Sequence, residues 1–423
     1  WHEDLPYTYP HWAYDVATYL IYNYCGGFFA LYITTFILTA IMGILLYYII
    51  KRLSKNGVIS FIVTLAVMFF MKSFIAARAQ LVTFILFELT IYFIEKFIET
   101  KKIRYGVGLI IIPILIANVH CAVWPFYFVL FLPYLAEYFV ACYLDSYIFS
   151  KFLIKAHKSN IKTLTRRLEK GKNVDKIKEK IEKSNKTIFK IENTIENRRI
   201  KRIEARNNPY RIKLEKNKNV KWLLLIIVIS AFTGLLTPIG DAPYTYLIKT
   251  YEGNTTKSIS EHLPITLINH ENVLIAFSLF LGILIFTDTK IKLRDLFMLG
   301  GLTILLLMSR RQVSLFMLIG GIIFAKLAYE LFNKYDNKGL KELSEAMTTL
   351  IGKILVLSLM ILIMFTMVRK SSKAEFINSS TYPVEATKFI KDNLDYKNIR
   401  LFNEYNYGSY LLFQDIPVFI DSR

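Results

Sequence analysis

The most constraining feature of this chain is a series of long apolar segments. Of its 423 residues, 54% are hydrophobic and 15% are aromatic, which is more apolar material than one soluble core needs. A bilayer core of about 30 Å asks for about 20 apolar residues per helix. The sequence therefore predicts an all-α polytopic membrane protein with about ten membrane helices. They are expected near residues 27–50, 57–77, 80–98, 105–119, 122–143, 222–238, 272–287, 296–308, 313–332 and 346–368.

Basic charge alternates between the loops that join these segments. Lys and Arg are retained on the cytoplasmic side of a membrane. The basic loops are residues 51–52, 101–104, 151–221, 290–294 and 334–341. In contrast, residues 1–26 and 118–124 contain no Lys or Arg, and residues 237–272 contain only Lys249 and Lys257. We therefore expect a multi-pass protein of the cell membrane, with the second group of loops and the C-terminal segment outside.

Most of the basic charge belongs to residues 151–221. This segment holds 24 Lys or Arg and 8 Asp or Glu, and so carries +16 of the formal net charge of +20. A charge confined to one segment argues against nucleic acid as the partner of the chain. Regularly spaced Ile and Leu predict a cytoplasmic helical hairpin, interrupted at Gly171 and ending before Pro209. Two interpretations stay open: a solvated insertion, or a surface for anionic lipid head groups or an acidic partner.

The predicted organisation has four parts. Residues 1–150 form an outer loop and the first five membrane helices, 151–221 the basic insertion, and 222–368 the remaining five helices. Residues 369–423 are expected to begin a small extracytoplasmic α/β domain, with a helix at 384–394 and strands at 399–402 and 418–420 around a loop that contains Gly408. Because the chain starts at Trp1 and ends just after the last strand, we expect a fragment of a longer protein.

The three cysteines have no spacing typical of a metal site or a disulfide framework. Cys25, Cys121 and Cys142 lie in or beside apolar segments, without a CxxC pattern or a spacing to His that is typical of a metal site. We expect buried thiols.

Polar residues between apolar segments are the candidates for chemistry. Charged residues at membrane depth cost about 2.5 to 3.5 kcal/mol each, so they persist mainly where they line a cavity or have a partner. Arg78 and Gln80 separate two apolar segments, and Arg310 and Arg311 follow a segment of only about 13 residues, a rise of about 20 Å. Asn118 and His120 end another short segment. We predict a recessed outer cavity in which arginines bind a phosphate, against the alternative that they only extend to the interface.

Carboxylates in the outer loops are candidate bases. The first loop contains Glu3, Asp4 and Asp15, and Asp15 precedes a helical stretch, where it either accepts a proton or only caps the helix. The loop of residues 237–272 adds Asp241, Glu261 and His262 as possible substrate contacts.

Several of these motifs, in this order, resemble a prokaryotic family of largely uncharacterised membrane proteins. The motifs are His11-Trp12, Arg78-Ala79-Gln80, Asn118-Val119-His120, Thr237-Pro238-Ile239-Gly240, Glu261-His262-Leu263-Pro264, Ser309-Arg310-Arg311, the segment from Leu401 to Tyr410, and Pro417 to Arg423. The resemblance covers nearly the whole chain except the basic insertion. That family is similar to the GT-C glycosyltransferases, which include protein mannosyltransferases and the lipid A aminoarabinose transferase.

The resemblance implies a function. GT-C enzymes transfer a sugar from a polyprenyl-phosphate donor to an acceptor at the outer face, and their usual catalytic carboxylate lies in the first outer loop. The resemblance would make Glu3, Asp4 or Asp15 the catalytic carboxylate, although the expected preceding helix is missing. It would also add Glu404 and Tyr405 to the substrate-binding residues. A divalent cation that bridges phosphate and carboxylate stays open. The alternatives are a transporter or flippase of lipid-linked glycans and a non-catalytic envelope scaffold. Membrane lipids are expected partners, and the sequence does not predict the oligomeric state.

Overall fold

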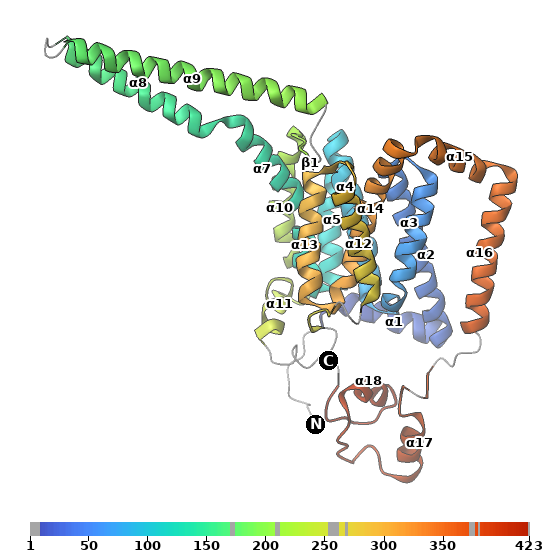
Figure 1. Cartoon of the computed structure of the whole chain (residues 1–423). Helices are drawn as coiled ribbons and strands as arrows, with labels where there is room; N and C mark the ends of the chain where they lie inside the picture. The colour runs from blue at the N-terminus through green and yellow to red at the C-terminus, as the bar shows by residue number, and fades with distance from the viewer. Residues whose placement is uncertain are drawn as a thin grey trace. The chain divides into compact units, whose positions relative to one another are not determined.

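The protein is described here from a computed structural model (Figure 1). The structure describes residues 9–169, 174–207, 212–252, 262–266, 270–371, 377–379 and 381–421. These residues are mostly helical, as expected for an all-α protein. They divide into two compact units, one of residues 35–337 and one that combines residues 1–34 with 338–423.

The larger unit is a helical bundle that carries a helical hairpin. Its helices begin with the end of α2 (Gly27–Ser54). The others are α3 (Gly57–Phe70), α4 (Ala79–Thr100), α5 (Ile103–Val119), α6 (Trp124–Val129), α7 (Leu132–Ser146), α8 (Ile148–Leu168), α9 (Val174–Asn207), α10 (Lys221–Phe232), α11 (Ala242–Glu252), α12 (Glu271–Phe286), α13 (Leu293–Met308) and α14 (Val313–Tyr335). Two-residue strands β1 (Ile212–Lys213) and β2 (Ile291–Lys292) pair in parallel.

Four helical segments of the described chain are long and apolar enough to cross a membrane. They are Gly27–Ser54, Cys121–Leu168, Lys218–Leu235 and Arg310–Tyr335, and α15 (Asn337–Thr348) with α16 (from Leu350) makes a fifth if this bent pair counts as one span. Helices α3, α5 and α12 are apolar but shorter. All ten segments expected to cross the membrane contain helix, but the number of crossings stays a prediction.

Several helix boundaries differ from the predicted ones. Helices α5 and α13 have 17 and 16 residues, because their first turns include charged residues that an apolar pattern omits. The segment expected at 122–143 is divided into α6 and α7, with Pro133 in the first turn of α7. Proline lacks the N–H that a continuous helix would need there.

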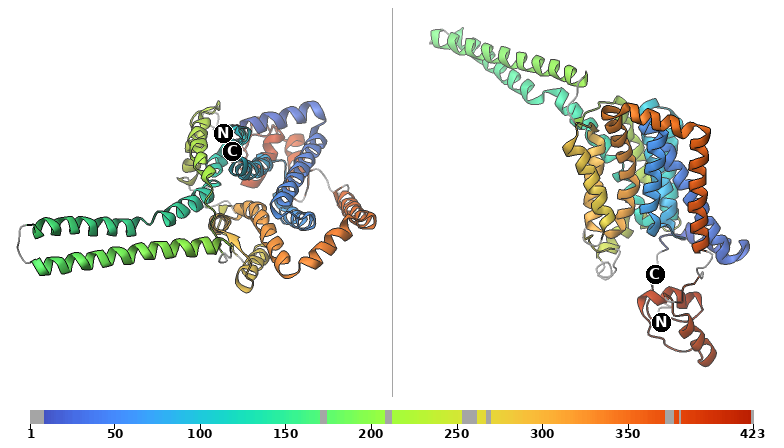
Figure 2. Two further views of the ribbon diagram at one scale, coloured as in Figure 1. Left: turned by 90° about the horizontal axis from the view of Figure 1, so that it is seen from above. Right: turned by 45° about the vertical axis from the view of Figure 1, so that its right-hand side comes forward.

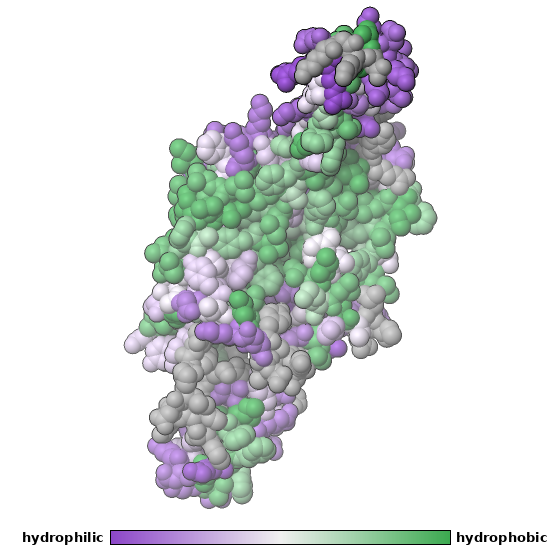
Figure 3. Space-filling view, turned by 90° about the vertical axis from the view of Figure 1, so that its left-hand side faces the viewer, coloured by the Kyte–Doolittle hydropathy of each residue, from purple (hydrophilic) through white to green (hydrophobic). Residues whose placement is uncertain are grey.

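The outer surface of the bundle is apolar. Figure 3 shows hydrophobic residues over the bundle and hydrophilic residues over the hairpin. Large side chains that are at least half exposed include Leu225, Val228, Leu279, Ile285 and Ile304. Because exposed apolar area on this scale is costly in water, it favours a lipid environment for the bundle.

The hairpin confirms the helical prediction for the basic insertion. Helices α8 and α9 pack side by side as an antiparallel pair (Figure 2). The less exposed positions of α8 recur at alternating steps of three and four residues, and the same is true of α9. That period is typical of a coiled-coil seam. The seam consists of residues 154, 157, 161, 164 and 168 on α8, and 177, 181, 184, 188, 191 and 195 on α9.

The smaller unit contains α1 (Trp12–Cys25), most of α15, α16 (Leu350–Ser371), α17 (Val384–Asn393) and α18 (Tyr405–Phe413). Helix α1 ends at Gly26, whose positive φ of 116° closes the last turn in the left-handed region that favours glycine. The axes of α15 and α16 are bent by 77° at their junction.

The C-terminal residues differ in part from the predicted α/β domain. Helix α17 confirms the helix expected at 384–394. The two expected strands are joined by a single parallel bridge, Leu401 to Val418. The loop expected around Gly408 was wrong, because this glycine lies inside α18. A Cβ at Gly408 would lie 2.3 Å from the carbonyl oxygen of Ile420, so the glycine permits close packing of the helix against the final segment.

Candidate functional site: an arginine cavity

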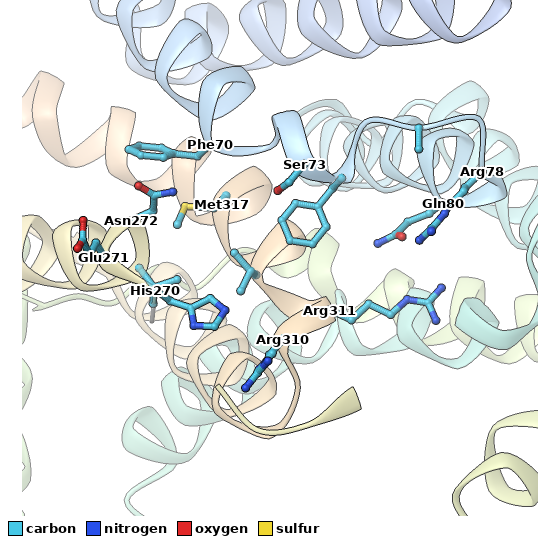
Figure 4. A pocket seen from close by; sticks show the side chains of 14 residues that line it. Phe70, Ser73, Arg78, Gln80, His270, Glu271, Asn272, Arg310, Arg311 and Met317 are labelled. Carbon is cyan, nitrogen blue, oxygen red and sulfur yellow. The ribbon is translucent and has the colours of Figure 1, made fainter. Parts of the chain in front are cut away.

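A cavity of about 780 Å³ lies at one end of the bundle. Its walls come from the end of α3, the turn before α4, the start of α12 and the turn between α13 and α14. Four of the predicted site residues line it: Arg78, Gln80, Arg310 and Arg311. We call this cavity the arginine cavity, and Figure 4 shows its side chains.

The turn between α13 and α14 presents two of the arginines. Ser309 is extended, and the Arg310–Gln312 segment forms a short 3-10 turn that leads into α14. The backbone N–H of Arg310 donates to the carbonyl oxygen of Leu263 (3.0 Å), so a second loop supports this turn. Of the polar atoms in the described residues, Arg310 Nε is one of the few that are buried without a hydrogen-bond partner.

The turn before α4 presents the third arginine. Arg78 has extended backbone and is the N-cap residue of α4. Two residues further on, Gln80 Nε2 donates to Ser314 Oγ (3.4 Å), and Ser314 Oγ donates to the carbonyl oxygen of Arg311 (3.0 Å). This chain of hydrogen bonds ties the two arginine-bearing turns together, although they are more than 230 residues apart.

Electrostatics at the cavity favour an anion. Three arginines and a single carboxylate, Glu271, are among its lining residues. Helices α4, α12 and α14 all begin at the cavity, and a helix N-terminus carries a partial positive charge. Arginine side chains bind phosphate in a bidentate manner. The arrangement therefore suits a phosphate or a similar anion.

The cavity also contains residues that the site prediction omitted. His270 is the N-cap residue of α12, and its Nδ1 lies 2.9 Å from the carbonyl oxygen of Thr266. Glu271 begins α12, and Ser73 and Asn272 add further polar groups. Figure 4 labels His270 and Arg310 among the side chains that line the cavity. His270 and Glu271 stand directly before an apolar segment in the sequence, as Arg78 does. That position is the signal by which they could have been found.

Asn118 and His120 do not belong to this site. The Nδ2 of Asn118 donates to the carbonyl oxygens of Ile114 (2.8 Å) and Leu236 (3.0 Å). His120 is buried, with its Nδ1 2.9 Å from Thr83 Oγ1. Both side chains join the end of α5 to neighbouring elements, and their proposed contact with substrate stays a prediction.

The outer-loop candidates do not line the cavity either. The exposed Asp241 accepts hydrogen bonds from Tyr244 and Thr245 through its carbonyl oxygen, and so starts α11. His262 directly precedes Leu263, whose carbonyl supports the Arg310 turn. Glu261, like Glu3 and Asp4, lies outside the described residues.

Asp15, Glu404 and Tyr405 belong to the smaller unit. Asp15 lies in the first turn of α1, and desolvation raises the pKa of its carboxyl above the ordinary value. Glu404 is the N-cap residue of α18, and its Oε1 accepts a hydrogen bond from Asn406 (3.1 Å). Tyr405 begins α18. The catalytic and substrate-binding roles expected for these three residues stay predictions.

A cluster of paired charges lies at the other end of α4 and α13, and sequence reasoning did not find it. The side chain of Arg294 is 7% exposed, and it contacts Glu95 at 3.2 Å, Glu215 at 3.3 Å and Glu137 at 3.7 Å. Lys326 completes the cluster, 3.0 Å from Asp295 and 3.8 Å from Glu95. We call these six residues the ionic cluster. Its signal in the sequence was the presence of acids and a lysine within apolar helices.

The exposed edge of the ionic cluster is Glu215, which also contacts Lys292 at 2.9 Å. Burial alone would raise the pKa of Glu215, but the positive charges of Lys292 and Arg294 lower it below its ordinary value. The carboxylate form of Glu215 is therefore the one that the fold stabilises.

Within the described part of the chain, no group of three or more His, Cys, Asp or Glu side chains could hold a metal ion. No protein-family model matches the chain, and neither a curated protein nor a solved structure matches it. The site is therefore interpreted from its own geometry.

Proposed function

We propose that this chain is an integral-membrane glycosyltransferase of GT-C type, which transfers a sugar from a polyprenyl-phosphate donor at the extracytoplasmic face. The observation that carries the proposal is the arginine cavity. It joins Arg78, Arg310 and Arg311 from two distant turns in a space large enough for a phosphate and part of a sugar. The motif resemblance adds the reaction type, and the same residues carry both arguments.

In the proposed reaction, the acceptor hydroxyl attacks the anomeric carbon of the donor sugar. The bond between that carbon and the phosphate oxygen breaks, and the lipid phosphate leaves with its electron pair. Guanidinium groups of the cavity stabilise the charge that develops on the phosphate. A carboxylate takes the hydroxyl proton. Glu271 is the carboxylate that the cavity itself supplies.

An apolar groove supports a lipid-linked donor. This groove, of about 230 Å³, is lined by residues of α4, α6, α7, α13 and α14. Its lining residue Leu315 follows Arg311 by four residues, or about 6 Å along a helix. The groove suits the first isoprene units of a tail whose phosphate lies in the arginine cavity.

The test uses purified protein and a panel of labelled polyprenyl-phosphate sugars. We expect one donor to bind and its sugar to move to an acceptor. Absence of both donor binding and transfer across the panel would refute the proposal. Movement of the intact lipid-linked sugar across the bilayer without transfer would instead assign the chain to the flippases.

The matched variants are Arg311→Ala and Lys72→Ala. Lys72 lies in the turn just after α3 and is not among the cavity residues. An enzyme should lose turnover in Arg311→Ala and keep it in Lys72→Ala, with both variants folded. A scaffold should be indifferent to both changes.

A further inference from the structure

The two helices of the hairpin differ in charge pattern. Helix α8 contains six Lys or Arg and no Asp or Glu, whereas α9 contains eleven basic and six acidic residues. Part of the charge of α9 is neutralised within the helix, where Lys186 lies 2.7 Å from Glu182 and Arg199 lies 3.6 Å from Glu196. Helix α8 has no acidic residue of its own to do the same.

The cations of α8 follow one face. Steps of three or four residues separate successive members and place them on one side of a helix. All five are exposed, and they are offset by about 120° from the seam that packs on α9. The residues are Lys151, Lys155, Lys158, Lys162 and Arg166. We call this stripe the basic face of α8.

The basic face begins where the apolar surface of the bundle ends. Helix α7, which precedes it, exposes Phe139 and Tyr143, each 52% accessible. After a left-handed residue at Tyr147 the chain turns into α8, whose first turns expose Phe149 (71%) and Phe152 (68%). Of the two hairpin helices, α8 is the one that faces the bundle in Figure 1 and in the right-hand view of Figure 2. Exposed aromatics beside lysines are typical of a helix at a lipid interface.

We propose that the basic face of α8 binds the anionic lipid head groups of the bilayer that surrounds the bundle. Basic residues close to an anionic surface are attracted by its potential, and the attraction declines within a Debye length. Phe149 and Phe152 anchor the start of the helix, and the basic face holds it along the surface. A nucleic acid is disfavoured as the partner, because the face starts at the apolar bundle surface. The proposal is independent of the glycosyltransferase activity.

The test measures the distance of α8 from the lipid head groups in the full chain. The three native cysteines are replaced, Ser159→Cys on α8 is labelled with a donor dye, and the protein is placed in nanodiscs with head-group-labelled acceptor lipid. We expect stronger energy transfer in phosphatidylglycerol-containing discs than in pure phosphatidylcholine discs. High salt should remove the difference.

Two triple variants provide the matched comparison. Lys155→Gln, Lys158→Gln and Lys162→Gln remove three of the six basic residues of α8, and we expect the lipid-dependent difference to fall by about half or more. Lys176→Gln, Lys180→Gln and Lys183→Gln remove the same charge with similar spacing from α9 and should leave the difference unchanged. Circular dichroism checks that the hairpin stays helical in both.

Three results would overturn the proposal. One is equal energy transfer in the two bilayers, and another is an equal loss of the difference in the two triple variants. The third is tight binding of a labelled oligonucleotide in phosphatidylcholine discs at physiological salt, lost in the α8 variant, which would assign the face to nucleic acid.

Discussion

The two ends of the bundle use arginine in opposite ways. At the ionic cluster, Arg294 lies against three glutamates of the chain and is almost inaccessible. Along α4, about 22 Å away, the arginine cavity is lined by three arginines and one carboxylate around about 780 Å³. The first arrangement supplies its own counter-charges and stabilises the fold. The second has a surplus of positive charge and room for a ligand that would neutralise it.

The largest expected difference between the two ends comes from replacing one arginine at each end, Arg294 in the ionic cluster and Arg310 in the arginine cavity. Arg294→Ala leaves buried carboxylates without their partner, and we expect a loss of about 3–5 kcal/mol in the free energy of unfolding. Arg310→Ala, its matched control, should change stability by less than about 0.5 kcal/mol. Thermal unfolding in detergent measures both. Equal destabilisation would show that the arginine cavity is structural as well.

The second prediction concerns activity and assumes the proposed transfer reaction. Arg311→Ala should lower kcat by about 10² to 10³, the usual effect of removing one group that stabilises developing negative charge. Arg311→Lys should recover only part of this rate, because an ammonium group lacks the bidentate geometry. Steady-state transfer assays measure the series. Full activity in Arg311→Ala would remove this residue from the reaction.

Two carboxyls of one helix sharpen the comparison further. Glu88 and Glu95 are seven residues apart on the same face of α4, and both are buried. Both oxygens of Glu88 lack a hydrogen-bond partner in the described structure, whereas Glu95 contacts Arg294, Lys326 and Tyr134. Glu88→Met should therefore raise the unfolding free energy by about 1 kcal/mol, while Glu95→Met should lower it. Destabilisation by Glu88→Met would indicate an interaction that the geometry does not contain.

The smallest expected effect is the pH dependence of the cluster edge. The folded pKa of Glu215 is lowered, so its contribution to stability is complete above the unfolded pKa of about 4.3. That contribution is lost as the pH falls through the folded value. The difference in Tm between the wild type and Glu215→Gln should therefore be constant near neutral pH and shrink in acid. A difference that grows in acid would contradict the assignment.

Sequence patterns predicted those features that depend on residues close together in the chain. The helices, the hairpin seam at Ile161, Leu164 and Ile188, and the site residues Arg78 and Arg311 follow from apolar periodicity and from charges at helix ends. The partnership of Arg294 with Glu95 could not be predicted, because it joins residues 199 positions apart.

The contacts of individual residues depend on packing between elements, and hydropathy along the sequence does not predict them. Asn118 and His120 resembled cavity residues, since each polar group ends an apolar helix, but their hydrogen bonds join neighbouring elements. Gly408 resembled a loop residue, and only its approach to Ile420 explains a glycine within a helix.

The ion pair between Asp145 and Lys216, at 2.9 Å, has a practical consequence. Asp145 lies just before the hairpin and Lys216 just after it, so the chain leaves and rejoins the bundle at almost the same point. The hairpin can therefore be replaced without moving the two points at which the chain joins the bundle. Residues 148–207 can be exchanged for a short linker, or for a larger rigid domain that serves as an imaging marker, without rerouting the helices on either side.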